Sequence, residues 1–253
     1  MLTGYQSYSI NLSGHICLAI PPFEISAPDF PTVDKVEIFT RNGAQIAVKI
    51  QFNHVPTEQD AESIGMLIAS QVADRLAFEY KVAANDPIKA ECSFQSLNTC
   101  GERHAFAASH LSLATVAHDV RTIDAAGLPT LKPAIEAFQP NKDLYYSQFR
   151  WIMCQADPVA RFMHLYKILL SLEGGPNHAQ GPVDAFIVGQ EPSVQTVFNQ
   201  NPRVNRNETI YTRLRNEVGH EIPGTTPAST RQGMENHVDR LADHVKTAIS
   251  RIP

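Results

Sequence analysis

Three residues near the end of the chain have the types and spacing for chemistry on RNA. The stretch RLRNEVGHEIPG, residues 213 to 224, holds Arg215, Asn216 and His220. A histidine can accept and return a proton near neutral pH. An arginine offers several N–H donors to charge that develops on phosphate oxygens, and an asparagine can orient either group. These side chains would suit attack of an RNA 2'-hydroxyl on the adjacent phosphorus, which in principle needs no metal ion.

The spacing of these residues sets a condition on any such site. At 100° per residue of an α-helix, Asn216 and His220 share a face, whereas Arg215 lies about 140° around the axis from His220. One unbroken helix would therefore hold the guanidinium and the imidazole apart. Either the last turn unwinds at Gly219, or a second copy of the helix supplies the missing group. A two-fold homodimer, with residues 207 to 251 near its axis, meets the second condition.

A structural role would explain the same residues without chemistry. Asn216 and His220 could cap a helix end while Arg215 forms a surface ion pair with Glu217 or Glu221. An arginine followed at short spacing by a histidine also arises by chance in a chain with 10 histidines. Other pairs that match this loose pattern are Arg103–His110, Arg231–His237 and Arg213–His220. Among these matches, only Arg215 is followed directly by an asparagine.

Helical periodicity dominates the chain from residue 141 onward. The second helix, begun by Asp157-Pro158, should bury Phe162, Leu165, Tyr166 and Leu169, and the third should bury Ile210, Leu214 and Val218. Asn205 and Glu208 have the spacing of a capping box for the third helix. Residues 175 to 204, rich in Pro, Gly, Asn and Gln, predict a surface insertion with at most one or two short helical turns. The four helices, which suggest an antiparallel bundle, are expected at residues 141–153, 158–174, 205 to between 219 and 223, and 230–252.

Strand periodicity dominates the first half. Alternating apolar residues on either side of Arg41-Asn42-Gly43 predict a hairpin over residues 33 to 53. Helical spacing follows from Thr57, which we expect to cap the helix, to about Ala84, with Ile64, Leu67, Ile68, Val72 and Leu76 on one side. Strands are expected again at residues 89–97 and 104–116. The sequence thus predicts an α+β protein: a small mixed sheet with one long helix in residues 1–126 and a helical domain in residues 127–253.

The third helix carries a family resemblance. A four-helix bundle with Arg215-Asn216-x-x-x-His220 at the end of its third helix resembles a HEPN domain. This resemblance implies that the domain dimerises, that two copies of the motif meet in one cleft, and that the protein is a metal-independent endoribonuclease. The whole chain, including the run DLYYSQFRWIMCQADPVARFMHLYKILL, is also similar to methylamine-utilisation J proteins.

Two functional hypotheses follow. The first is a homodimeric endoribonuclease of antiviral defence or a toxin, with Arg215, Asn216 and His220 as catalytic residues and RNA as substrate. Its N-terminal domain would sense a trigger or bind an operon-encoded protein. The second is a non-catalytic HEPN-like binding or scaffolding protein that is accessory to a defence or metabolic operon.

Other chemistry-bearing residues favour ordinary structural roles. His104, His110 and His118 lack metal-ligand spacing and lie on apolar runs. The aromatic residues Tyr145, Tyr146, Phe149 and Trp151 are expected in the core or a dimer interface rather than as base-stacking platforms. Arg161 and His164, three residues apart on the second helix, are further candidates for lining the cleft around His220.

Composition and motifs exclude several classes of protein. There is no P-loop, GxSxG, HExxH, zinc-finger or GxGxxG pattern, so we predict no metal and no cofactor. The formal net charge of -5 argues against bulk attraction to nucleic acid, although residues 201–253 hold eight Lys and Arg against six Asp and Glu. Neither a signal peptide nor a membrane span is expected, so we expect a cytoplasmic protein. The four cysteines form no CxxC pair and are expected to be buried thiols.

Overall fold

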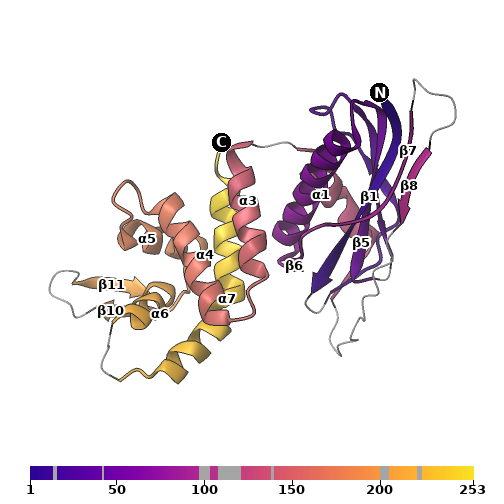
Figure 1. Cartoon of the computed structure of the whole chain (residues 1–253). Coiled ribbons are helices and arrows are strands. Elements are labelled where there is room, and N and C mark those ends of the chain that lie inside the picture. Colours follow the sequence, from indigo (N-terminus) through magenta and orange to yellow (C-terminus); the bar gives the residue numbers. More distant parts are fainter. Residues whose placement is uncertain are drawn as a thin grey trace. The chain divides into compact units, whose positions relative to one another are not determined.

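Alternating apolar residues in the first half form an antiparallel sheet in the computed structural model (Figure 1). The structure describes residues 1–13, 16–41, 43–96, 103–107, 121–137, 140–199, 205–220 and 224–253. The sheet has seven strands in the order β3-β4-β5-β1-β7-β8, with β6 paired to β1. They are Leu2–Ser13 (β1), Phe23–Ile25 (β3), Val33–Thr40 (β4), Gln45–Val55 (β5), Ala83–Ala84 (β6), Ile88–Ser96 (β7) and Arg103–Ala107 (β8).

The direction of the strands corrects one expectation. Each described strand pair of the seven-stranded sheet is antiparallel, rather than mixed as expected. The reason is that β4–β5 and β7–β8 are consecutive strands joined by short connections, which favour antiparallel pairing. A parallel pair does form, between β2 (Ile16–Leu18) and β9 (Arg121–Ile123), but it is a separate ladder.

The predicted hairpin is confirmed. β4 and β5 pair from Val33↔Phe52 to Thr40↔Ile46. Gly43 in the connection has φ 74°, a left-handed conformation that glycine adopts without steric cost, and Asn42 lies outside the described residues. Of the strand expected at residues 104–116, β8 supplies the first part, and residues 108–120 also lie outside the described residues.

Helix α1 (Glu58–Tyr80) runs along one face of the sheet (Figure 1). Thr57 caps it as predicted, because its Oγ1 accepts a hydrogen bond of 3.1 Å from the Asp60 backbone N–H. Leu67, expected on the apolar side, is instead exposed, since a residue next to Ile68 points about 100° away from it. The core between helix and sheet includes Tyr8, Ile10, Val48, Ile50, Phe52, Ile68, Val72 and Leu76.

The first compact unit extends further than the predicted boundary near residue 127. The chain divides into Met1–Arg150 and Trp151–Pro253. Helix α2 (Leu128–Glu136) follows a short 3₁₀ turn at Ala125–Gly127, and α3 spans Pro140–Met153. The ring of Phe78 on α1 packs edge-on against Tyr146 and Phe149 of α3, with centroids 4.6 and 5.5 Å away. These contacts place most of α3, expected as the first bundle helix, in the first unit.

The second unit is helical, with α4 (Pro158–Glu173) packed along α7 (Pro227–Ser250). The predicted buried stripe of α4 is confirmed, and α7 buries a stripe of its own, Met234, Val238, Leu241, Val245 and Ile249. Thr226 and Ser229 form a capping box, so α7 begins at Pro227 rather than Thr230. Within the part of the chain that the structure describes, no helix is long and apolar enough to span a membrane.

The segment between α4 and α7 differs most from expectation. Residues 175–204 contain a full helix, α5 (Gln180–Gln190), and a strand, β10 (Thr196–Asn199), rather than short turns. β10 pairs antiparallel with β11 (Arg206–Thr209), so the residues expected to open the third helix form a strand. Helix α6 (Ile210–Gly219) then begins after Thr209, whose Oγ1 accepts from the Thr212 backbone N–H. The predicted capping box of Asn205 and Glu208 is therefore wrong.

The cysteines are less uniformly buried than expected. The thiol of Cys92 is buried in the sheet, Cys17 is partly exposed and Cys154 is exposed. Cys100 lies outside the described residues. Cys154 is exposed because it follows directly after the last turn of α3, where the chain turns toward α4.

Candidate functional site

The end of helix α6 positions the three predicted site residues. The helix stops at Gly219, the first residue of the predicted range 219–223, and His220 is already extended, with φ −143° and ψ 142°. The backbone N–H of His220 donates to the carbonyl of Asn216 at 3.0 Å, which ties the chain to the last turn. Its imidazole is exposed to solvent and makes no hydrogen bond with another described residue. His220 is therefore free to meet a ligand or another chain.

Asn216 lies beneath this surface and is 8% exposed. Its Oδ1 accepts from Gln180 Nε2 at 2.7 Å and from an N–H of Arg215 at 3.0 Å. Its Nδ2 donates to Gln180 Oε1 and to Glu208 Oε2, both at 3.3 Å. Both ends of the amide are occupied, so the side chain has a fixed position and no free donor or acceptor to offer a substrate.

Arg215 is half-buried, and its hydrogen bond to Asn216 is the one that its guanidinium makes within the described residues. The ion pair expected with Glu217 is absent. Glu217 instead accepts from Arg213 Nε at 3.1 Å and from Thr230 Oγ1 at 2.7 Å, while Glu221 lies outside the described residues. Arg215 is thus held at one nitrogen and keeps its other donors available.

The arginines of the competing motif matches differ from Arg215 in their charge environment. Arg213 lies 3.1 Å from a Glu217 oxygen and 3.9 Å from Glu208. Arg231 lies 2.9 Å from Asp157 and 3.4 Å from Glu235. Arg103 and His110 have side chains outside the described part of the structure. Of the motif arginines whose side chains are described, only Arg215 has no carboxylate partner among the described residues.

A buried polar cluster holds the other side of α6. Asp184 of α5 accepts hydrogen bonds through Oδ1 from the Thr209 backbone N–H (3.0 Å), Thr209 Oγ1 (2.7 Å) and Thr212 Oγ1 (2.6 Å). Its other oxygen pairs with Arg206. Because Thr212 gives its proton to Asp184, Tyr166 of α4 donates to Thr212 Oγ1, at 2.7 Å. Burial raises the pKa of Tyr166 far above its usual value, which keeps this phenol protonated.

Within one chain, no described side-chain contact joins the His220 imidazole to Arg215 or Asn216. His220 lines an open concavity whose other described residues include Asp157, Glu217, Thr226 and Arg231. Neither Arg215 nor Asn216 is among the described residues that line it. Arg215 and His220 thus have no described contact, as expected from their angular separation on a helix, whereas the face expected to be shared by Asn216 and His220 is lost where the chain leaves the helix after Gly219.

Arg161 and His164, the further candidates, do not line the described part of this concavity. Two nitrogens of Arg161 donate to the carbonyl of Gln155: Nε at 3.3 Å and one terminal nitrogen at 2.7 Å. The ring of His164 lies edge-on to Trp151, with centroids 4.8 Å apart. Trp151 itself is exposed, unlike Tyr146 and Phe149, so it lies outside the core of the single chain, and its place in a dimer interface stays a prediction.

The sequence did not predict a second polar cluster in this unit, which forms around Glu191. Glu191, which caps α5, accepts through Oε2 from Tyr211 at 3.3 Å and contacts His244 Nε2 at 3.1 Å and Arg240 Nε at 3.4 Å. Burial lowers the pKa of His244, although Glu191 opposes the shift. The cluster joins α5, α6 and α7 through side chains far apart in sequence. The only sign of this cluster in the sequence of α7 is that His244 stands at a core position.

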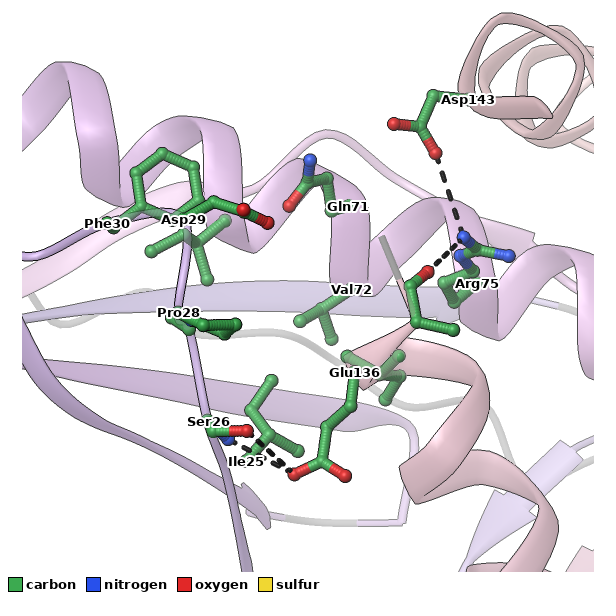
Figure 2. Close-up of a pocket in the computed structure, with 14 residues that line it drawn as sticks. Ile25, Ser26, Pro28, Asp29, Phe30, Gln71, Val72, Arg75, Glu136 and Asp143 are labelled. Carbon is green, nitrogen blue, oxygen red and sulfur yellow. Dashed lines mark hydrogen bonds and ion pairs between the residues drawn. The ribbon is translucent and has the colours of Figure 1, made fainter. Parts of the chain in front are cut away.

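A small cavity in the first unit, with both polar and apolar residues in its lining, is shown in Figure 2. It has a volume of about 40 Å³ and is lined by residues that include Ser26, Gln71, Glu136 and Asp143. Arg75 closes it, donating to the Ala137 carbonyl at 2.8 Å and lying 3.7 Å from Asp143 Oδ1. Burial raises the pKa of Asp143, against the effect of Arg75. A cavity of this size holds water molecules and is far too small for a nucleotide.

The histidines considered as metal ligands fall largely outside the described residues: His110 and His118 entirely, and His104 in its side chain. Among described residues, no group of three or more His, Cys, Asp or Glu side chains lies within reach of a shared metal ion. Comparison of the chain with protein-family models, with curated proteins and with solved structures gave no match.

Proposed function

We propose that this protein is a metal-independent endoribonuclease, cytoplasmic and homodimeric, that acts in antiviral defence or as a toxin. The observation that carries the proposal is Arg215: a half-buried guanidinium held by one hydrogen bond to a buried asparagine, without a carboxylate partner in the described residues. A cation held in this way suits an anionic ligand. The resemblance of Arg215-Asn216-x-x-x-His220 to the HEPN motif supports RNA as this anionic ligand.

The reaction uses the nucleophile of RNA itself. The 2'-oxygen attacks the adjacent phosphorus as its proton passes to a base, and the bond from phosphorus to the 5'-oxygen of the next nucleotide breaks as that oxygen takes up a proton. His220 is exposed and suited to proton transfer at either oxygen. The free donors of Arg215 stabilise the charge on the phosphorane oxygens. The products are a 2',3'-cyclic phosphate and a 5'-hydroxyl.

Two copies of the chain are needed to complete this site. Within one chain, Arg215 turns toward Asn216 while His220 continues past the helix end into a separate concavity. A second copy related by a two-fold axis near α6 and α7 would bring the Arg215 of one chain to the His220 of its partner. The first unit then remains available for an operon-encoded protein.

One observation favours the alternative of a non-catalytic HEPN-like binding or scaffolding protein. Asn216 has all its hydrogen-bonding capacity engaged inside the fold, so one motif residue has a sufficient structural role. In this alternative, Arg215 and His220 are surface groups that recognise a partner. Cleavage of RNA distinguishes the two functions, since a scaffold has none.

The proposal is tested with purified protein and mixed RNAs in EDTA. Wild type should cleave and leave 2',3'-cyclic phosphate ends, and 2'-O-methylation at the scissile nucleotide should block cleavage. His220→Ala should lower the rate by about 10²- to 10⁴-fold and Arg215→Ala by about 10²- to 10³-fold. Arg251→Ala, which removes an arginine already paired with Glu173 and absent from the described lining of the His220 concavity, is the matched control and should cleave normally. Equal activity of wild type and the three variants would show that Arg215 and His220 are not the catalytic residues.

A further inference from the structure

The buried groups behind Arg215 form a connected chain that ends at the proposed site. Glu208 is fully buried, and its Oε2 accepts from Asn199 Nδ2 at 2.8 Å and from Asn216 Nδ2 at 3.3 Å. Its Oε1 has no hydrogen-bond partner within the described structure, and Arg213 approaches this oxygen only to 3.9 Å. A buried carboxylate that is only half satisfied is costly to keep. Because Glu208 accepts a hydrogen bond from Asn216, it can act on the side chain that holds Arg215.

The charges at the two ends of Asn216 fix which way its amide points. A carboxylate can only accept a hydrogen bond, and a guanidinium can only donate one. Glu208 therefore selects Nδ2, which leaves Oδ1 facing Arg215. A rotated amide would place its oxygen against the buried carboxylate and its NH₂ group against the guanidinium. Both contacts would be repulsive, so one orientation is strongly preferred.

Gln180 closes the arrangement from helix α5. It donates to Asn216 Oδ1 at 2.7 Å and accepts from Nδ2 at 3.3 Å, so the two amides form a paired ring of hydrogen bonds. Gln180 and Glu208 lie 36 and 8 residues from Asn216 in sequence, on elements different from α6. The position of Asn216 thus depends on where α5 and β11 lie.

We infer that Gln180 and Glu208 are positioning residues that act on Arg215 through Asn216. This inference rests on the proposed function, in which Arg215 contacts the scissile phosphate. Arg215 has a long flexible side chain and one hydrogen bond that restrains it. Gln180 restrains both ends of the Asn216 amide and Glu208 selects its orientation, so loss of either group loosens the amide and releases the guanidinium to solvent. The catalytic arginine is then present but misplaced in the transition state.

The test compares variants by kcat and KM on an RNA substrate. Gln180→Met removes both amide hydrogen bonds and keeps the length of the side chain, and it should lower kcat by about 10- to 10²-fold, the scale of a misplaced catalytic group. KM should change by less than about twofold, because the guanidinium acts mainly in the transition state. Glu208→Met should act in the same way. Glu208→Gln, which keeps an accepting oxygen for Asn216, should recover most of the lost activity.

The matched control is Thr212→Val on the same helix. It removes a buried hydrogen bond to Asp184 of similar geometry but touches none of the groups behind Arg215. It should lower the unfolding midpoint and leave kcat unchanged in the temperature range where the variant is folded. Wild-type kcat in Gln180→Met, together with an inactive Arg215→Ala, would overturn the inference while the proposed function stands. An equal loss of kcat in folded Thr212→Val would also overturn it, since any weakening of α6 would then suffice.

A second measurement separates failure of the inference from failure of the proposed function. The side-chain N–H signals of Arg215, assigned by comparison with Arg215→Lys, report its mobility in NMR relaxation without any substrate. Wild type should show a restrained guanidinium, and Gln180→Met a mobile one. A wild-type protein that cleaves no RNA but shows this contrast would lose the proposed function and keep the positioning role. Equal mobility in the two proteins would refute the positioning role.

Discussion

Removal of the Asp184 carboxylate tests how the second unit holds helix α6. Asp184→Ala leaves three donors of Thr209 and Thr212 without their acceptor and Arg206 without its ion-pair partner. Removal of one partner of a buried charged pair costs about 3 to 5 kcal/mol. The side chain of Arg206 is 31% exposed and can turn to water, which places the expected loss toward the lower end. At about 4 to 8 °C per kcal/mol for a domain near this size, the midpoint should fall by roughly 12 to 30 °C.

The control is the same substitution at an exposed cap. Asp157 begins α4 by accepting from the Ala160 backbone N–H at 3.2 Å, and Asp157→Ala should cost about 1 kcal/mol. Urea unfolding can be followed by the fluorescence of Trp151, the single tryptophan, which lies against His164 in this unit. If Asp184→Ala proved no more destabilising than Asp157→Ala, the cluster would not hold α6 as described.

Three further outcomes are expected. In Gly65→Ala a new Cβ would lie 2.6 Å from the Tyr8 hydroxyl, so urea unfolding should show a loss of about 1 to 3 kcal/mol. Burial raises the pKa of Asp74 from 3.8 to about 6, despite Arg150, so the stability of wild type relative to Asp74→Asn should fall as the pH rises from about 4 to 6. Burial lowers the pKa of His244 from 6.5, so wild type should lose stability relative to His244→Gln as the pH falls below 6.5. Denaturant midpoints across the pH range would check both signs.

The elements predicted well are those whose signals are local. The β4–β5 hairpin follows from alternation around a glycine that adopts a left-handed conformation. Helix α1 follows from its periodicity and the Thr57 cap, and α4 from its apolar stripe with Asp157 and Pro158 at the start. In each case, residues within one or two turns determine the structure, so a single sequence contains the necessary signals.

Helix α5 and the strands around it depend on distant partners. Gly181, Pro182 and Gly189 lower helix propensity, and no side chain caps the first turn of α5. The carboxylate of Asp184 ties this helix to Thr209 and Thr212, which lie 25 and 28 residues away. The pairing of β10 with β11 likewise overrides the capping pattern of Asn205 and Glu208. Tertiary hydrogen bonds, which local pattern does not encode, determine this region.

The candidate site was predicted in residue type but not in environment. The sequence suggested Arg215, Asn216 and His220 as site residues and a helix end between residues 219 and 223. It placed Val218 in the buried stripe, yet that side chain is 47% exposed, because α6 ends one residue later and packs through Leu214 and a polar face. The burial of Asn216 depends on Gln180 and Glu208, which come from other elements. A buried helix face made of polar residues shows the same sequence pattern as a solvent-exposed face. The burial of Asn216 therefore could not be predicted from sequence.

The central claim is a site shared between two copies, and complementation tests it most directly. Arg215→Ala and His220→Ala, each inactive alone, are mixed, refolded together and assayed on RNA in EDTA. Random pairing makes about half of the dimers mixed, and each mixed dimer holds one intact site of two, so about a quarter of wild-type activity should return. No recovery in confirmed heterodimers, or a wild-type protein that is monomeric at 28.0 kDa and cleaves no RNA, would contradict the account.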